Sequence, residues 1–355
     1  MALRILFVSH TDVFGAFRVG SHHYARELAK AGNDVVHLST PLSLAHTITR
    51  RISPERRRAI PRGVHTDDFG VRHVVPRSVL PAGVGYIDWI ALLRGLRLPT
   101  DFDVVFLDQP LLWNSSLRQV ARTLIYRPTD EYPAGVKARL QADILTKADG
   151  VIATSGRVLE ALGEIETPSV VHVNGVEVER FEGTTDSTMR DRTCVYVGAL
   201  DHRFDQMQVE QWASEFPDWR FEIAGPPLSG WKPSSSNIVT PGTQPYERLP
   251  KLFRSARIGL LPLSDSPLNA GRSPMKLYEY LAAGLSVVAK RTAVIHPNDE
   301  IGVFTYENSA QARESLASAM RFPVPNTRGV TAAREQSWTT KAKCVLEFAQ
   351  AIGKQ

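Results

Sequence analysis

Short apolar runs of strand length alternate with longer stretches of helical periodicity along most of the chain. The runs that we predict as strands are residues 4–9, 35–39, 103–108, 123–126, 148–155, 170–177, 193–200, 219–224, 258–263 and 285–289. The stretches that we predict as helices include residues 20–31, 111–121, 273–284 and 340–352. Strands that alternate with helices in this way indicate β-α units with parallel sheets, so we predict an α/β fold.

The length and the distribution of polar residues predict two domains. A chain of 355 residues exceeds the usual size of one domain. Residues 183–192 are polar and rich in Thr and Asp, as linkers often are. We therefore expect an N-terminal domain over residues 1–182, a C-terminal domain over residues 193–335, and a helical segment over residues 336–355.

The composition is that of a globular protein in a reducing compartment. Apolar residues make up 43% of the chain and charged residues 22%, as in ordinary globular domains. The two cysteines, Cys194 and Cys344, cannot form a disulfide framework, and the N-terminus lacks the apolar core and cleavage site of a signal peptide. No apolar run is long enough to span a membrane. We therefore expect a cytoplasmic location.

A mild excess of basic charge limits the kinds of partner. The formal net charge of +5 permits an acidic substrate or an anionic membrane surface and does not require nucleic acid.

The loop after the first strand lacks the G-x-G-x-x-G pattern of dinucleotide sites, and no Walker A pattern occurs. No clustered His, Cys or Asp spacing is typical of a metal site. We expect no nucleic-acid partner, no metal and no cofactor.

Two segments of the N-terminal half each allow two interpretations. Residues 49–63 are rich in arginine and form either a solvated loop or an anchor for anionic lipid headgroups or a diphosphate-linked acceptor. Residues 86–98 mix bulky apolar residues with arginines and form either a helix in a membrane interface or a helix packed in the core. The arginines of the first segment are Arg50, Arg51, Arg56, Arg57, Arg58 and Arg62.

The helix predicted at residues 273–284 has marked ends and a candidate site at its N-terminus. Ser273 is a good N-cap, Pro274 fits the first helical position, and Gly284 ends the helix. The unpaired N–H groups and the dipole of the first turn attract an anion, and Lys276 and Arg272 add positive charge there.

Ser273, Lys276 and Arg272 thus suit a phosphate or diphosphate, and Glu279, one turn from Lys276, could accept hydrogen bonds from the two hydroxyls of a ribose. The alternative is a capped surface helix with a Lys276–Glu279 ion pair.

The sequence Ser-Pro-Met-Lys-Leu-Tyr-Glu-Tyr-Leu-Ala-Ala-Gly at residues 273–284 resembles the donor-site helix of GT-B glycosyltransferases. The resemblance implies that Lys276, Arg272, Ser273 and Met275 contact a nucleotide-sugar diphosphate and that Glu279 binds the ribose. Many retaining members have a second Glu eight residues earlier, where this chain has Gly271. The Glu-x7-Glu pattern of the retaining mechanism is therefore incomplete.

Further motifs are similar to those of GT-B enzymes. Residues 148–155 and 174–177 resemble the segments that close the N-terminal domain. Residues 237–250 resemble the segment that contacts the nucleotide base, which implies roles for Gly242 and Tyr246. The turn at Gly198 and the following Arg203 resemble a loop that touches the diphosphate.

This resemblance implies the GT-B architecture, in which two Rossmann-like domains face each other across a cleft. Residues 1–182 would bind the acceptor, residues 193–335 the nucleotide sugar, and the helix in residues 336–355 would cross back to the N-terminal domain.

The N-terminal domain is loosely similar to bacterial exopolysaccharide glycosyltransferases of the xanthan glucuronosyltransferase type. The loop with His10 and Asp12 and the strand exit at residues 126–130 carry this resemblance. It implies an inverting, metal-independent enzyme that works at the cytoplasmic membrane face on polyprenyl-diphosphate-linked sugars. The general base would be Asp130, which follows a predicted strand, or else His10 or Asp12. Alternatively, Asp130 is the N-cap of the next helix.

We therefore expect a glycosyltransferase that moves a hexosyl or glucuronosyl group from a UDP-sugar to a glycan or a lipid-linked oligosaccharide. The alternatives are a sugar-nucleotide epimerase, a retaining GT-B transferase, and a noncatalytic protein that binds a sugar nucleotide.

Overall fold

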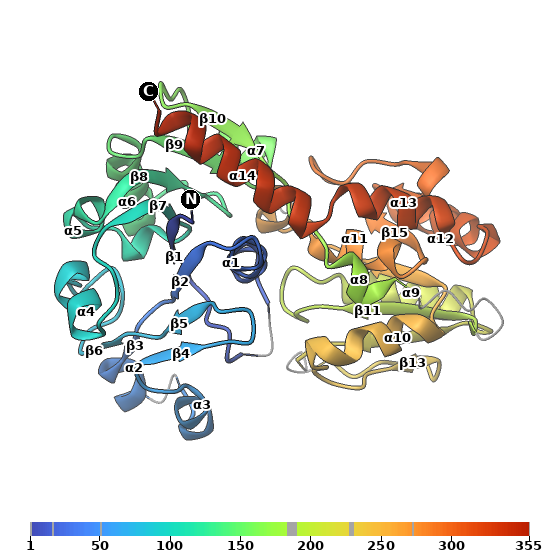
Figure 1. The fold of residues 1–355 in the computed structure, drawn as a ribbon. Coiled ribbons are helices and arrows are strands. Elements are labelled where there is room, and N and C mark those ends of the chain that lie inside the picture. Colours follow the sequence, from blue (N-terminus) through green and yellow to red (C-terminus); the bar gives the residue numbers. More distant parts are fainter. Residues whose placement is uncertain are drawn as a thin grey trace. The chain divides into compact units, whose positions relative to one another are not determined.

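The chain forms two compact units in a computed structural model that describes residues 2–15, 18–49, 52–182, 190–226, 231–271 and 273–354. Unit 1 consists of Met1–Val173 together with Thr339–Gln355, and unit 2 consists of Asn174–Trp338. Figure 1 shows the elements of both units.

Unit 1 is built on a sheet with the strand order β10-β9-β8-β7-β1-β2-β5-β4. Its strands are parallel except β4, which is antiparallel to β5. Residues 5–8 of the central strand β1 are fully buried, because helices cover both faces of such a sheet. The strands are β1 (Arg4–Val8), β2 (Asp34–Leu38), β4 (Val64–Thr66), β5 (Arg72–Val74), β7 (Phe102–Leu107), β8 (Ala121–Tyr126), β9 (Gly150–Ala153) and β10 (Ser169–Val171).

The helices of unit 1 come from both ends of the chain (Figure 1). The last helix, α14 (Trp338–Ile352), packs on β9, where Phe348 and Ile352 occupy the space that a side chain at Gly150 would need. A short sheet pairs β3 (Leu42–Ser43) with β6 (Arg77–Ser78). The other helices are α1 (Gly20–Lys30), α2 (Leu44–Ile48), α3 (Pro54–Ala59), α4 (Trp89–Gly95), η1 (Pro110–Leu112), α5 (Ser115–Gln119), α6 (Gly135–Leu145) and α7 (Gly156–Glu160).

Unit 2 is built on a parallel sheet with the order β13-β12-β11-β14-β15-β16. Its strands are β11 (Thr193–Val197), β12 (Arg220–Ala224), β13 (Ile238–Val239), β14 (Ile258–Leu261), β15 (Ser286–Lys290) and β16 (Val303–Tyr306). Its helices are α8 (Val178–Phe181), α9 (Gln206–Glu215), η3 (Tyr246–Arg248), α10 (Leu249–Ser255), η4 (Pro267–Asn269), α11 (Met275–Ala282), η5 (Asp299–Ile301), α12 (Ser309–Arg321) and α13 (Thr327–Glu335).

The boundary between the units differs from the expected end of the first domain at residue 182. The difference arises because α8 packs in the core of unit 2, where Val178 and Phe181 are buried. The rings of Phe181 and Phe253 stack with centroids 5.5 Å apart. Residues 183–189 of the expected linker lie outside the described residues.

The helix predicted over residues 111–121 is wrong in its extent. Asn114 has an extended backbone, and its side chain accepts a hydrogen bond from the N–H of Ser116 while donating one to the carbonyl of Ile87. This tertiary contact separates η1 from α5, and Ala121 already begins β8.

The strand predicted over residues 170–177 is also shorter than expected. β10 ends at Val171, and Val176 forms an isolated bridge with Ser337. The chain passes into unit 2 between these two residues, so one continuous strand is not possible.

The two ambiguous segments of unit 1 both contain helices. In residues 86–98, α4 buries Trp89 and Leu93 in the core, which favours the core-packing interpretation. In residues 49–63, α3 begins after Ser53, whose side chain accepts a hydrogen bond from the N–H of Arg56. Arg50 and Arg51 lie outside the described residues. No helix in the described part of the chain combines the length and the hydropathy needed to cross a bilayer.

Candidate active site

The candidate donor residues of unit 2 follow strands at one edge of its sheet. The strand order reverses at β11, and ligands of open parallel sheets bind at the carboxyl ends of the strands near such a reversal. Gly198 follows β11, Gly242 follows β13, and the segment after β14 leads to α11. The topology therefore brings these predicted residues to a common edge.

The start of α11 differs from the prediction. The N-cap is Pro274 and the first helical residue is Met275, so the assignment of Ser273 as N-cap is wrong. The physical reason is a long-range contact: Asn174 donates its backbone N–H to Ser273 Oγ at 3.0 Å and its side-chain amide to the Ser273 carbonyl at 2.7 Å. Because a proline has no side-chain acceptor, Pro274 gives the first turn of α11 no side-chain cap.

The end of α11 is as predicted. Gly284 has a left-handed backbone with φ 75°. Its N–H donates to the Leu281 carbonyl, and the N–H of Leu285 donates to the Tyr280 carbonyl. This pair of bonds is a Schellman motif, which favours glycine at this position.

Lys276 and Glu279 form an ion pair in which the carboxylate is buried and the ammonium partly exposed. Lys276 Nζ lies 2.6 Å from Glu279 Oε2, and the exposed fractions of the two side chains are 21% and 2%. The interpretation of this helix as a surface helix is therefore wrong, although the ion pair that it invoked is present. An unpaired buried carboxylate is costly, so Glu279 can give up the Lys276 ammonium only if another hydrogen-bond donor takes its place.

Tyr246 joins this pair to residues that sequence reasoning missed. Lys276 Nζ lies 5.8 Å from the centre of the Tyr246 ring, and the Arg180 guanidinium lies 4.9 Å from it. Arg180 Nε also donates to Glu177 Oε2 at 2.8 Å. Burial lowers the pKa of Arg180, but the hydrogen bond to Glu177 holds it above the ordinary value. The i, i+3 spacing of Glu177 and Arg180 was the available signal.

Glycines allow the loops at this edge to approach closely. The N–H of Gly198 donates to the Ala224 carbonyl at 3.1 Å, and a Cβ at Gly225 would lie 2.1 Å from the Gly198 carbonyl oxygen. Gly242 has a left-handed backbone with φ 74°, and its carbonyl accepts the N–H of Gly225. The loops after β11, β12 and β13 are thus held together by backbone contacts.

Of the two other cations predicted to contact the diphosphate, Arg203 and Arg272, the structure describes only Arg203. Arg203 donates to both oxygens of Asp201, at 2.9 Å from Nε and 2.5 Å from Nη2. These hydrogen bonds lower the pKa of Asp201 to about 2. Arg203 therefore already has a carboxylate partner within its own loop. Arg272 lies outside the described residues.

The candidate bases of unit 1 also lie at the carboxyl ends of neighbouring strands. His10 follows β1, Asp108 follows β7, and Asp130 follows β8, and these strands are adjacent in the sheet. Asp108 and Arg127 form a fully buried ion pair with two hydrogen bonds of 2.9 Å, and Arg127 lies over the Tyr24 ring at 4.5 Å. Sequence reasoning did not find this pair, which fixes the start of the loop that carries Asp130.

Asp130 and His10 have properties suited to proton transfer. Asp130 is exposed and accepts a hydrogen bond from the Thr129 hydroxyl at 3.2 Å. The next helix has Ala134 as its N-cap, so the alternative role of Asp130 as an N-cap is wrong. Displacement of water by surrounding protein lowers the pKa of His10, while the charges of Asp108 and Asp130 oppose this shift. A neutral imidazole near a carboxylate can accept a proton.

Asp12 is held in an ion pair. Arg56 Nη2 lies 2.6 Å from Asp12 Oδ1 and 2.5 Å from Oδ2, and the N–H of Phe14 donates to Oδ1 at 2.9 Å. Both oxygens of the Asp12 carboxylate are thus already occupied by partners in its own unit. Asp12 therefore suits the task less well than Asp130 or His10.

No group of three or more His, Cys, Asp or Glu side chains is placed to hold a metal ion in the ranges that the structure describes.

Sequence comparison relates this chain to glycosyltransferases. Residues 203–338 match a family model described as Glycosyl transferase-like. A Bacillus subtilis strain 168 protein, TuaH, provisionally named a teichuronic acid biosynthesis glycosyltransferase, is 26% identical over 204 residues. The match covers 53% of this chain and 50% of TuaH, so it spans about half the length of that relative.

Solved structures share the fold over nearly the whole chain. Sucrose-phosphate synthase from Thermosynechococcus elongatus is 14% identical with a TM-score of 0.72, and 99% of each chain is covered. Anabaena Alr3699/HepE, solved in complex with UDP and glucose, is 14% identical with a TM-score of 0.71 over 98% of this chain and 100% of its own. The fold is GT-B, and the resemblance stated from the sequence is confirmed at this level.

Proposed function

We propose that this chain, which has the GT-B fold and a second unit similar in sequence to glycosyltransferases, transfers a sugar from a UDP-sugar to a glycan or a lipid-linked oligosaccharide. The observation that carries the proposal is the Lys276–Glu279 pair, with a buried carboxylate and a partly exposed ammonium, at the start of α11, where the N-cap residue gives no side-chain cap. Such a pair combines an anion site with a carboxylate that needs hydrogen-bond donors.

Donor binding would separate Lys276 from Glu279 and give each a new partner in the nucleotide sugar. The diphosphate accepts hydrogen bonds from the N–H groups of Met275 and Lys276 and from the Ser273 hydroxyl, and it attracts the Lys276 ammonium. Glu279 then loses its cation inside the protein, where an unpaired carboxylate is costly. The two ribose hydroxyls replace the ammonium as donors. Gly242 and Tyr246 lie on the base side of the nucleotide, and the Gly198 loop lies near the diphosphate.

Transfer needs a base for the acceptor and a site for the leaving diphosphate. Asp130 takes the proton of the acceptor hydroxyl, with His10 as the second candidate, while the hydroxyl attacks the anomeric carbon from the face opposite the diphosphate. Inversion follows from this single displacement. Lys276 and the helix N-terminus stabilise the charge that develops on the diphosphate, in the manner of a metal-independent transferase.

The relatives support the choice of donor and acceptor class. HepE was solved with UDP and glucose, and TuaH is named for teichuronic acid biosynthesis. These names favour UDP as the nucleotide and a hexosyl or glucuronosyl group as the sugar. A polyprenyl-diphosphate-linked acceptor would bring the enzyme to the cytoplasmic face of the membrane, and the net charge of +5 favours contact with an anionic surface.

The test is thermal stabilisation of the protein by UDP-, GDP-, ADP- and TDP-sugars, with Lys276→Ala and the control Lys251→Ala measured in parallel. Lys251 is exposed on α10 in the same unit. We expect stabilisation by UDP-sugars and an affinity about 10- to 100-fold lower in Lys276→Ala, because a charge-assisted contact contributes about 1.5–3 kcal/mol. Unchanged donor affinity in Lys276→Ala would exclude the diphosphate assignment.

A turnover assay with the stabilising donor separates the remaining possibilities. Transfer to an added glycan supports the proposal. An isomerised sugar nucleotide formed without acceptor would identify an epimerase, and binding without turnover would identify a noncatalytic protein.

A further inference from the structure

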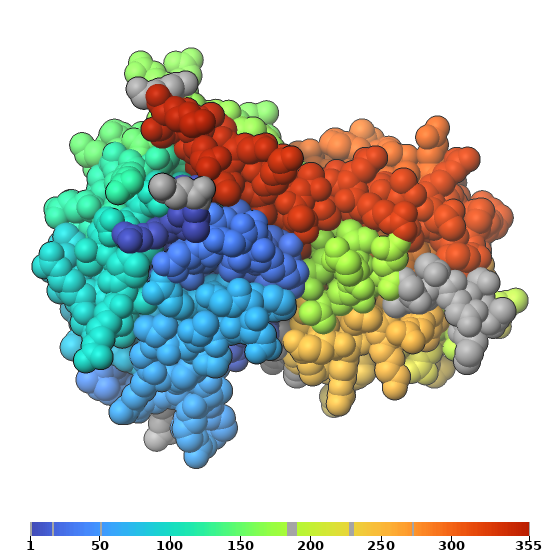
Figure 2. Space-filling model, viewed as in Figure 1, coloured from blue at the N-terminus to red at the C-terminus, as the bar shows by residue number. Residues whose placement is uncertain are grey.

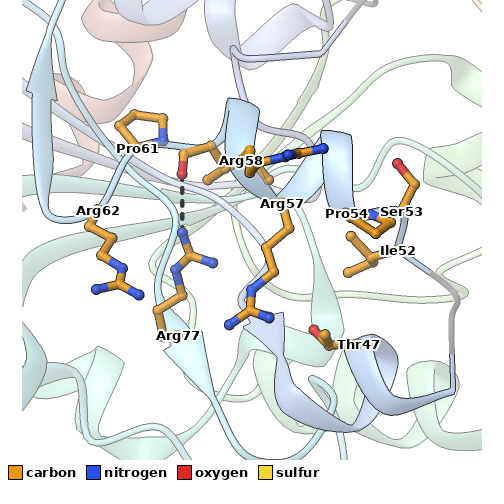
Figure 3. A pocket seen from close by; sticks show the side chains of 10 residues that line it. Thr47, Ile52, Ser53, Pro54, Arg57, Arg58, Pro61, Arg62 and Arg77 are labelled. Atoms are coloured by element: carbon orange, nitrogen blue, oxygen red, sulfur yellow. Dashed lines mark hydrogen bonds between the residues drawn. The ribbon is translucent and has the colours of Figure 1, made fainter.

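Unit 1 contains a hollow of about 1040 Å³ at the arginine-rich segment. The hollow lies between α2, α3, the chain that follows α3, and β6 (Figure 3). The segment around α3 projects from the surface of unit 1 (Figure 2). The residues that line the hollow are Thr47, Ile52, Ser53, Pro54, Arg57, Arg58, Ile60, Pro61, Arg62 and Arg77.

Positive charge in this hollow is not neutralised by its lining. None of the described lining residues is acidic. Arg58 lies 3.5 Å from Glu55, but no ion pair involves Arg57, Arg62 or Arg77 in the described part of the chain. Arg77 Nη2 instead donates to the carbonyl of Ile60 at 3.1 Å, which fixes this side chain in the wall of the hollow.

The guanidinium group of Arg77 is close enough to those of Arg57 and Arg62 to be repelled by both. Displacement of water and the charges of Arg62 and Arg57 lower the pKa of Arg77. Figure 3 shows the Arg57 and Arg62 side chains on either side of Arg77. Like charges held together in this way are relieved by a bound anion, and guanidinium groups match the geometry of phosphate oxygens.

Two exposed apolar side chains lie within two residues, along the chain, of residues that line the hollow. Ile48 follows the lining residue Thr47 and is 73% exposed, and Val79 is two residues beyond Arg77 and is 71% exposed. The N–H of Ala45 donates to the Val79 carbonyl, so α2 and the chain after β6 lie side by side. A phosphate site with an apolar rim favours a phosphate that is attached to an alkyl chain over a soluble one.

We propose that this hollow binds the phosphate group of an anionic membrane lipid. Arg57, Arg62 and Arg77 contact the phosphate, while Ile48 and Val79 enter the interface between headgroups and acyl chains. This inference rests on the membrane association proposed above and gives it a site, but it does not depend on sugar transfer.

The test is sedimentation of the full chain with vesicles of phosphatidylcholine alone or with added phosphatidylglycerol. We expect binding only to the anionic vesicles. The variant Arg57→Gln/Arg62→Gln should weaken this binding on the order of 10-fold or more. The control variant Arg94→Gln/Arg139→Gln removes the same charge from exposed positions on α4 and α6 and should bind as the unchanged protein does.

A second pair of measurements separates lipid from soluble phosphate. The proposed donor site also binds a diphosphate, so stabilisation by inorganic pyrophosphate is measured in the Lys276→Ala background. There, Ile48→Ser/Val79→Ser should weaken vesicle binding and leave the stabilisation by pyrophosphate unchanged. Stabilisation by pyrophosphate that Arg57→Gln/Arg62→Gln removes, without vesicle binding, would overturn the lipid assignment, and so would equal losses of vesicle binding in the two arginine variants. UDP-sugar stabilisation is measured on the same samples. Failure of the lipid site with intact donor binding is thereby distinguished from failure of the proposed transferase.

Discussion

Two buried carboxylates, Asp108 and Glu279, differ in how their charge is neutralised. Asp108 receives two hydrogen bonds from Arg127, and both side chains are fully buried. Glu279 receives one from Lys276, whose side chain retains contact with solvent. The first pair therefore serves the fold, and the second can exchange its partner for a ligand.

We expect Asp108→Asn to destabilise unit 1 by about 3 kcal/mol or more, because the change leaves the Arg127 charge buried without a counter-ion. Urea unfolding measures this loss. Glu131→Gln, which breaks the partly exposed Glu131–Arg157 pair, is the control and should cost less than about 1 kcal/mol. Equal effects of the two changes would contradict a structural role for the Asp108–Arg127 pair.

We expect Asp130→Asn to abolish sugar transfer and to leave donor affinity and stability unchanged. Asp130 is exposed and makes one local hydrogen bond, so the isosteric change disturbs little else. Initial rates and UDP titration measure the two effects. Retained transfer in Asp130→Asn, with loss in His10→Gln, would assign the base to His10.

The sequence predicted side-chain contacts between residues of one helix, but not contacts between residues of different elements. Lys276 and Glu279 lie within one helix, so their spacing alone indicated a pair. Asp108 and Arg127 are 19 residues apart and meet only because β7 and β8 are neighbours. Ser273 has the local pattern of an N-cap, but Asn174, 99 residues away, donates to its hydroxyl.

At the scale of elements, each apolar run that we predicted as a strand contains one, and tertiary contacts decided where helices begin and end. The prediction missed the short strands β3, β4, β5, β6, β13 and β16. The Schellman glycine at position 284 is a local signal and was read correctly. The break at Asn114 depends on the Ile87 carbonyl, which a local pattern does not contain.

The contact of β14 with α11 gives a prediction at this scale. A Cβ at Gly259 would lie 2.3 Å from the ring of Tyr280, which is buried and accepts the N–H of Val197. We expect Gly259→Ala to destabilise unit 2 by about 1–3 kcal/mol and to weaken UDP binding, because the ring and its helix must shift. Calorimetry and UDP titration measure these effects.

The matched control is Gly156→Ala, at the start of α7 in unit 1. Apart from its chain neighbours and the backbone of its own helix, no atom of the described residues lies within 4 Å of a Cβ at this position. The Gly156→Ala variant should be as stable as the unchanged protein or slightly more stable, since alanine favours a helix more than glycine does. If Gly259→Ala left the stability of unit 2 unchanged, α11 would be less closely packed on the sheet than the structure indicates.

At the scale of the whole molecule, buried histidines make the stability of unit 1 depend on pH. His22 donates from Nε2 to the Thr11 carbonyl at 2.9 Å and accepts the Val19 N–H at Nδ1, so its neutral form is satisfied on both sides. Burial lowers the pKa of His22 to about 3. Burial and the neighbouring His22 and His73 hold the pKa of His37 well below its ordinary value.

The unfolded chain protonates these two histidines near pH 6.5, whereas folded unit 1 does not. Their contribution is therefore complete above about pH 6.5 and is lost as the pH falls, by up to about 1.4 kcal/mol per pH unit for each histidine. Calorimetry between pH 7 and pH 5 measures the slope. His22→Gln should flatten it and the exposed His202→Gln should not. Equal stability at pH 7 and pH 5 would contradict the conclusion that His22 and His37 stay neutral in folded unit 1.

Unit 1 is assembled from two separated stretches of chain, while unit 2 is continuous. During synthesis, all of unit 2 therefore emerges from the ribosome before the residues that complete unit 1. Until α14 arrives, Gly150 and its neighbours on β9 lack the cover of Phe348 and Ile352. The nascent first unit thus exposes apolar surface to chaperones until the residues of α14 have been translated.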